Sequence, residues 1–166
     1  AAAAIRDSES LLRSVVDLTN YSFKLYHTSV YLLKENKEDE TKSLKLSAAS
    51  GKVGHKMLKD GFSIGLTQKK SVVAQAARTL EPVIVRDTVN NDLFLEHPLL
   101  KNTRSEMAIP MVVADKLIGI FNVAADVPDR FSEDDLQTYI TLSAQTAVAL
   151  QNAQLYEEQI ATVERL

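Results

Sequence analysis

An unbroken helical pattern, from Phe131 to Leu166 without a proline or a glycine, limits the folds that this chain can adopt. Apolar or small residues recur along it at alternating spacings of three and four, as in a helix that packs along another helix. At 1.5 Å per residue this helix would be roughly 50 Å long, which is more than the width of a small domain. We therefore expect its second half to leave the domain and contact a partner. The residues of this heptad stripe are Tyr139, Leu142, Thr146, Ala149, Ala153, Tyr156, Ile160 and Val163.

The composition is that of one ordinary globular domain. Of the 166 residues, 45% are hydrophobic and 25% are charged, which suffices for a substantial core. The formal net charge is −3, so the chain has no basic excess and we expect no nucleic-acid partner. Apolar runs stay well below the length of about 18 residues that indicates a membrane span, so we expect no membrane segment in this stretch and a cytoplasmic location.

The sequence contains no cysteine. This excludes disulfides, thiolate nucleophiles, thiolate metal sites and chromophores attached through a thioether. The histidines His27, His55 and His97 are far apart in the sequence, so we expect no metal site. Neither a nucleophile paired with a base nor a glycine-rich phosphate loop is evident, so we expect no catalysis.

Alternating helical and strand patterns predict an α+β fold. Helical spacing covers Ile5–Tyr21 and Ser71–Arg78, and a single turn is expected around Leu93–Leu95. Four of the five glycines lie between Gly51 and Gln68, where we expect irregular structure. Pro110 predicts an edge position or a bulge in its strand. Strands are expected at Leu25–Leu33, Leu44–Ala48, Val83–Val85, Glu106–Val113 and Lys116–Ala124.

Six short stretches form an ordered series along the chain: Gly65–Gln68, Thr79–Asp87, Arg104–Pro110, Lys116–Phe121, Phe131–Leu136 and Gln151–Glu158. In this order and at these spacings they resemble a GAF domain, from about Leu11 to Glu158. The resemblance implies a six-stranded antiparallel sheet with the terminal helices on one face. Loops and short helices would form a pocket on the other face.

The resemblance further implies a non-catalytic sensory module of a larger signalling protein, such as a histidine kinase or a cyclic-nucleotide enzyme. Such a module binds a small molecule and passes the signal through its terminal helices to an attached output domain. We assign residues 1–21 to an N-terminal dimer or linker helix, 22–152 to the sensory domain and 153–166 to a signalling helix. We expect a parallel homodimer whose contact is the heptad stripe. The alternative is a structural dimerisation module whose pocket is filled by its own side chains.

The same resemblance places the ligand-binding residues around one strand and the loop before it. We expect them to be Phe94, His97, Arg104, Ser105 and Glu106. Because Arg104 precedes a buried strand at the rim of the pocket, its guanidinium group could bind a carboxylate or a phosphate. The alternative is a surface ion pair of Arg104 with Glu106 or Asp92.

A cyclic nucleotide is a weak candidate ligand. Nucleotide-binding GAF domains carry an Asn-Lys pair after the penultimate strand, then a Phe, and then an Asp-Glu pair. Phe131 and Asp135 match this pattern, but Ala125-Asp126 replaces the Asn-Lys pair and Leu136 replaces the Glu. The family's ion pair cannot form, because Asp126 would face Asp135 with like charge. Both matching residues also have a structural explanation, one as a core anchor and the other as an acid at a helix N-terminus.

We expect no cofactor. A covalent bilin and the free-methionine-sulfoxide reductase activity of some relatives both require cysteines, which this sequence lacks. Haem is the alternative, because His97-Pro98 lies where haem-binding sensor members place their axial histidine. The spacing to the following proline is longer than in those relatives, and His-Pro also shapes this loop in members that bind no haem.

Overall fold

The computed structural model describes residues 2–166, with side chains from Asp7 onward. Helices and strands follow one another in an α+β order. In chain order they are α1 (Ala2–Phe23), β1 (His27–Glu35), β2 (Lys42–Ala49), α2 (Gly51–Lys59), β3 (Ser63–Gly65), α3 (Val72–Thr79), β4 (Val83–Val85), the 3₁₀ helix η1 (Pro98–Leu100), β5 (Ser105–Val113), β6 (Lys116–Ala125) and α4 (Glu133–Glu164).

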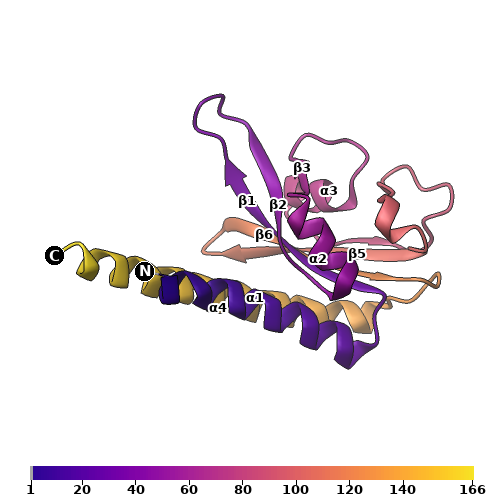
Figure 1. Cartoon of the computed structure of the whole chain (residues 1–166). Coiled ribbons are helices and arrows are strands. Elements are labelled where there is room, and N and C mark those ends of the chain that lie inside the picture. The colour runs from indigo at the N-terminus through magenta and orange to yellow at the C-terminus, as the bar shows by residue number, and fades with distance from the viewer. Residues whose placement is uncertain (1) are drawn as a thin grey trace.

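Within the described residues the strands form one six-stranded antiparallel sheet in the order β3-β2-β1-β6-β5-β4. The long helices α1 and α4 lie together along one face of the sheet, and α2 and α3 lie on the other (Figure 1). This arrangement confirms the predicted α+β class and its layers. Because both faces are covered, the central strands β1, β6 and β5 are buried on both sides over most of their length.

Alternate side chains of the central strands point into two separate cores, as the two-residue repeat of a strand requires. On β5, Met107 and Ile109 face the helix pair, whereas Ala108 faces α2 and α3. On β6, Phe121 and Ile120 divide between the two sides in the same way. Each central strand therefore connects the helix pair on one side to the short helices on the other.

Helices α1 and α4 run antiparallel. The backbone N–H of Ser8 donates to Glu157 Oε1 at 2.9 Å, and at the other end the ring of Phe23 lies 5.2 Å from that of Tyr139. Most of α4 therefore lies beside α1 of the same chain, and only its last part extends past the start of α1 (Figure 1). Among the described residues, no helix combines the length and the apolar character needed to cross a membrane.

The heptad stripe is partly used within this pair. Tyr139 is 1% exposed, and its ring packs on Phe23 and Phe131, so it is a core residue and is not available to a partner chain. This corrects its assignment to an intermolecular contact. The cause is that α1 and the sheet cover this side of α4. Of the other members, Thr146 is buried, Leu142, Ala149, Ala153 and Ile160 are partly buried, and Tyr156 and Val163 are exposed.

The start of α4 is fixed by the Ser-x-x-Asp sequence that precedes it. Ser132 Oγ accepts a hydrogen bond from the N–H of Asp135 at 3.1 Å, and Asp135 Oδ2 accepts one from the N–H of Ser132 at 2.9 Å. Two N–H groups that the helix itself cannot pair are thereby satisfied. Phe131, just before this capping box, is 1% exposed and anchors the helix to the core.

The segment from Gly51 to Gln68 is ordered, so the prediction of irregular structure is wrong. It forms α2 and β3. Gly51, the first residue of α2, and Gly61, two residues after its end, both adopt a φ value of +69°, a conformation that favours glycine. Gly54 lies inside α2, where a Cβ atom would overlap the backbone of Ala49. These glycines therefore serve turns and a close contact between a helix and a strand.

Two prolines shape local structure near the sheet edge. Pro98 is the first residue of η1. His97, just before it, caps this turn because its Nδ1 accepts a hydrogen bond from the N–H of Leu99. The helical turn therefore lies at Pro98–Leu100 and not at Leu93–Leu95. The pairing of β4 with β5 ends at Ala108, so Pro110 lies beyond it. The pairing of β5 with β6 shifts its register just after Met111. This agrees with the predicted edge position or bulge.

A glycine on β6 lies against the backbone of β1. A Cβ atom at Gly119 would overlap the carbonyl oxygen of Tyr31 on β1. We predict that Gly119→Ala lowers the free energy of unfolding by about 1–3 kcal/mol, the usual cost of overpacking a core. Urea denaturation measures the change. Gly65→Ala on β3 is the matched control, because a Cβ atom there meets nothing within 4 Å. Equal effects of the two substitutions would contradict the prediction.

Candidate functional site

A cavity of about 230 Å³ lies on the face of the sheet that carries α2 and α3. Strands β1, β6 and β5 form its floor, and α2, β3, α3 and the segment from Phe94 to Thr103 form its walls. The floor residues are His27, Tyr31, Glu106, Asn122 and Ala124. The walls are mainly apolar, and they include Met57, Phe62, Ile64, Val72, Val73, Phe94 and Leu100. A largely apolar cavity with a few convergent polar groups is typical of a ligand site.

A second, wider hollow of about 830 Å³ lies between α1, β2 and α2. Its lining includes exposed charges of both signs, among them Arg13, Asp17, Lys45 and Lys52. Solvated charges of mixed sign need no ligand. The smaller cavity is therefore the better candidate.

The sheet register places an imidazole and a carboxyl group on either side of a methyl group. His27 of β1 pairs with Ala124 of β6, and Ala124 pairs with Glu106 of β5. Residues directly opposite one another in antiparallel strands point to the same face. Neighbouring strands lie about 4.8 Å apart, so the backbones of His27 and Glu106 are separated by roughly 10 Å. The small side chain of Ala124 leaves the space between them open.

Asn122 holds the carboxyl group of Glu106 in place. Its Nδ2 donates to Glu106 Oε1 at 2.9 Å and to the carbonyl oxygen of Met107 at 3.1 Å, and Ser29 Oγ donates to its Oδ1 at 3.2 Å. Burial raises the pKa of Glu106 from 4.5 to about 7, although the hydrogen bond from Asn122 acts in the opposite direction. Both the protonated acid and the carboxylate form of Glu106 are therefore populated near neutral pH.

His27 is neutral at the floor of the cavity. It is 2% exposed, and burial, with a smaller contribution from His97, lowers its pKa from 6.5 to about 4. Among the residues that the structure describes, Nε2 of His27 has no hydrogen-bond partner. A buried polar atom without a partner destabilises the fold unless a ligand or water satisfies it.

Aromatic rings line the wall beside these polar groups. The ring of Phe62 lies 6.3 Å from that of Tyr31 and 4.9 Å from that of His97, both edge to face. Burial lowers the pKa of His97, while Asp60 acts to raise it. The resulting wall presents aromatic faces and edges to a bound molecule.

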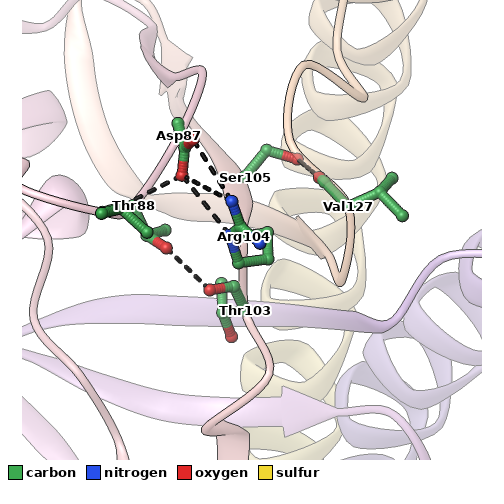
Figure 2. Close-up of polar contacts among 7 residues, drawn as sticks. Asp87, Thr88, Thr103, Arg104, Ser105 and Val127 are labelled. Carbon is green, nitrogen blue, oxygen red and sulfur yellow. Dashed lines mark hydrogen bonds and ion pairs between the residues drawn. The ribbon is translucent and has the colours of Figure 1, made fainter.

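Three of the five residues expected to bind a ligand line the cavity, and two lie outside it. Phe94, His97 and Glu106 belong to the lining. Arg104 turns to Asp87, 3.3 Å from its Oδ2, and Ser105 Oγ donates to the carbonyl oxygen of Val127 at 2.7 Å (Figure 2). The alternation of β5 directs Ser105 to the opposite face from Glu106. The ligand-binding role of all five residues stays a prediction.

The loop between β4 and β5 is closed near its ends. Thr88 Oγ1 donates to the carbonyl oxygen of Thr103 at 2.8 Å (Figure 2). The N–H of Thr88 donates to the carbonyl oxygen of Arg104 at 2.9 Å. Together with the pair Arg104–Asp87, these bonds fix the base of the loop. Its tip, with Phe94 and His97, is thereby held over the cavity.

Sequence reasoning missed four of the five floor residues. From the sequence, His27, Tyr31, Asn122 and Ala124 were not assigned to the ligand site. Strand alternation could have placed His27 and Tyr31 on one face, because they are four residues apart. The pairing of His27 with Ala124 depends on contacts between strands that are distant in the sequence.

The residues that match a nucleotide-binding pattern lie away from the cavity. Phe131 belongs to the core between the sheet and the helix pair. Asp135 caps α4 and lies 3.8 Å from Arg130. Both therefore have the structural roles that the sequence alone suggests for them.

A haem bound through His97 does not fit this site. A metal-bound imidazole normally donates a hydrogen bond from its other ring nitrogen. Here Nδ1 of His97 accepts the N–H of Leu99, so the proton of the neutral ring lies on Nε2, where a metal would bind. The cavity of about 230 Å³ is also smaller than the range of roughly 300–1,000 Å³ typical of drug-sized ligands. Among the described residues, no group of three or more His, Cys, Asp or Glu could hold a metal ion.

Comparison with known proteins gives one family and several structural relatives. A family model described as a GAF domain matches residues 6–151. Hybrid signal transduction histidine kinase G from Dictyostelium discoideum is 27% identical over 89 residues, which cover 52% of this chain and 3% of that protein. The chain therefore spans only a small part of the length of that relative.

Two solved structures illustrate the fold similarity. Type II free methionine-R-sulfoxide reductase from Thermoplasma acidophilum superposes with a TM-score of 0.71 at 20% identity, covering 87% of this chain and 93% of that one. The GAF domain from an Acinetobacter phosphoenolpyruvate-protein phosphotransferase gives 0.70 at 19% identity, covering 92% and 87%. At these identities the likeness concerns the fold.

The raised pKa of Glu106 predicts how stability depends on pH. In the unfolded chain this group ionises near 4.5 and in the folded chain near 7, so the folded state loses stability as the pH rises between these values. Over this range the free energy of unfolding of Glu106→Gln should rise relative to that of the wild type. The gain should total about 3 kcal/mol, at 1.36 kcal/mol per pKa unit, and then stay constant. Urea denaturation between about pH 5 and pH 8 measures it.

Glu96→Gln, on the exposed rim, is the control for this measurement. The difference between its free energy of unfolding and that of the wild type should not show the same dependence on pH. His27 acts with the opposite sign, because its lowered pKa makes the folded state lose stability as the pH falls from 6.5 to about 4. A difference between Glu106→Gln and the wild type that stays constant from about pH 5 to pH 8 would rule out a high-pKa carboxyl group at this site.

Proposed function

The chain belongs to the GAF domain family, and from that premise we propose that it is a regulatory module that binds a small ligand between His27 and Glu106. Binding is passed through α1 and α4 to an output domain of a larger signalling protein. The observation that carries this proposal is the cavity itself, which is lined by His27, a buried residue whose Nε2 has no hydrogen-bond partner among the described residues. A ligand that bonds this atom offsets its cost.

The same observation argues against a purely structural module with a self-filled pocket. Side chains that merely packed the space would leave neither a cavity of about 230 Å³ nor an unsatisfied imidazole nitrogen. The register across Ala124 keeps the space open, because a larger residue at that position would fill it.

The central strands provide the path from the ligand to the helices. Glu106 and Ala108 face the cavity side, while the intervening Met107 and the following Ile109 pack against the helix pair. A shift of β5 at the cavity therefore changes the surface on which α1 and α4 pack. A ligand that binds one arrangement more tightly biases the position of the helices by population shift.

We propose that the chain is not itself an enzyme. The reductases that share its fold differ from it in some 80% of aligned positions, and the present sequence contains no cysteine. The histidine-kinase relative and the GAF domain of a phosphotransferase instead support a role in regulation. The cytoplasmic location stays a prediction from the sequence.

We also propose that the module acts as a homodimer. The exposed members of the heptad stripe, Tyr156 and Val163, lie seven residues apart on α4 and are 53% and 66% exposed. Leu155 beside them is also exposed. Exposed apolar side chains at this spacing are typical of a helix that packs along a partner helix. A second copy of α4 supplies such a partner in parallel orientation.

Ligand binding can be followed with a fluorophore at the cavity. The chain has no tryptophan, and Phe94 is partly buried in the cavity lining. We predict that a small-molecule screen on Phe94→Trp yields a compound that changes its fluorescence and raises the Tm of the wild type. Val89→Trp, at an exposed position outside the lining, is the control and should not respond.

Native mass spectrometry of the freshly purified wild type would identify any retained molecule. If no compound changes the fluorescence of Phe94→Trp and none raises the Tm, the proposed ligand-binding function is wrong.

The dimer proposal predicts the effect of charges on α4. Tyr156→Lys combined with Val163→Lys should convert a dimer into a monomer, because two lysines on each helix would face one another across the contact. Light scattering coupled to size-exclusion chromatography measures the mass. Gln159→Lys, exposed on the same helix, is the control and should leave the mass unchanged. A monomeric wild type would overturn the proposal.

A further inference from the structure

The charges around the cavity are acidic. Among the described residues its lining contains the carboxyl groups of Glu106 and Glu96, and neither a lysine nor an arginine. Asp60 is near enough to the mouth to act on His97, although Lys56 lies 3.7 Å from its carboxylate. The arginine expected at the rim, Arg104, is turned to Asp87. An anionic ligand would find no cationic partner here, whereas a cation would find a carboxylate.

The walls suit the apolar part of a cationic molecule. The rings of Tyr31, Phe62 and Phe94 line the cavity together with the imidazole of His97. Aromatic faces attract ammonium groups, and more strongly where water is excluded. At about 30 Å³ for each water molecule, the cavity holds roughly eight of them, which limits the ligand to a compact molecule.

The floor offers hydrogen-bond acceptors to N–H groups. His27, neutral and unpartnered at Nε2 among the described residues, accepts a hydrogen bond there when its proton is on Nδ1. Among the same residues, Asn122 is the side chain that donates to Glu106, with its Nδ2 as the donor and Glu106 Oε1 as the acceptor. The two residues His27 and Glu106 flank Ala124, so the space above this methyl group lies between them.

We propose that the ligand is a small primary or secondary ammonium ion on a compact apolar body. Its N–H groups lie over Ala124 between Nε2 of His27 and the carboxylate of Glu106, and its apolar body packs on Phe62 and Phe94. This inference rests on the proposed function, whose ligand site it uses. It names the chemical class that the site takes.

The ion pair implies a proton balance. When the ammonium ion binds to the acid form of Glu106, the carboxyl group releases its proton to solvent and the ligand keeps its own. Affinity should therefore rise by roughly tenfold between pH 6 and pH 8 and then level off, because the pKa of the free carboxyl group is about 7. Of the titratable groups that face it, His27 and Tyr31 stay neutral over this range, since burial lowers the pKa of the histidine to about 4 and raises that of the tyrosine. Burial also lowers the pKa of His97.

Calorimetric titration of the full chain with four matched probes tests this inference. The probes are benzylammonium, benzyltrimethylammonium, benzyl alcohol and benzoate, which share one apolar body and differ in charge and in N–H donors. Benzylammonium should bind most tightly, with proton release at about pH 6 seen as a dependence of the heat on the buffer. Benzoate should bind least.

Variants assign the effect to the floor. Glu106→Gln keeps an acceptor for the Asn122 bond, and it should weaken benzylammonium at least tenfold and benzyl alcohol much less. Glu96→Gln on the rim is the control and should change benzylammonium affinity less than twofold. Ala124→Val, which narrows the space between the two acceptors, should weaken both probes. Far-ultraviolet circular dichroism and the Tm of each variant verify that it is folded.

Three results would overturn the inference. They are binding of benzoate or benzyl alcohol at least as tight as that of benzylammonium, an unchanged affinity in Glu106→Gln, and no binding of any probe. If the fluorescence screen with Phe94→Trp still finds a ligand of another class, the proposed function stands and only the ammonium class is wrong. If that screen also fails, both are wrong.

Discussion

The buried amide of Asn122 connects the three central strands, and the geometry of the cavity depends on it. It accepts from Ser29 on β1 and donates to Glu106 and to the backbone of Met107 on β5. A slip of one residue in either pairing would turn Asn122 toward the helix pair, where Phe121 and Val123 now pack. Because a buried polar group without partners is costly, this network favours one register over its neighbours. The same register places His27 and Glu106 on either side of Ala124, so the fold and the site share one determinant.

The long C-terminal helix has a different meaning in the structure from the one its sequence suggests. Its heptad stripe is real, but a repeat identifies a face and does not identify what covers that face. Here α1 of the same chain covers much of it, running antiparallel from the Phe23–Tyr139 contact to the bond between Ser8 and Glu157. The stripe past this pairing is short, and its exposed members are Tyr156 and Val163. Packing against α1 of the same chain therefore accounts for most of the length of α4, which the sequence alone suggests is too long for one small domain.

Local signals in the sequence were sufficient for most elements and insufficient for the site. Val83–Val85 has the predicted bounds of β4, and Ser132 and Asp135 form the expected capping box, because both depend on neighbouring residues. The glycines from Gly51 onward misled, since glycine marks a turn and a close packing contact equally well. Phe94, His97 and Glu106 were placed at the pocket by family resemblance. His27 and Ala124 were not, because their role arises from the pairing of β1 with β6, which joins two residues that lie 97 positions apart (124 − 27).

The groups that make the cavity suited to a ligand are also those that destabilise it when it is empty. His27 is held neutral by burial and Glu106 is held partly protonated, and each departure from the ordinary pKa is free energy taken from folding. A ligand that interacts with both groups offsets this cost only in the conformation to which it binds. Its binding free energy therefore differs between conformations of the cavity floor. Such a difference is what a regulatory module requires, because a ligand shifts an equilibrium only by its differential affinity for the two states. Since β5 carries Glu106 on one face and Met107 against the helix pair on the other, the energy is released on the strand that supports α4. The strain at the site and the transmission of the signal are in this way properties of the same strand.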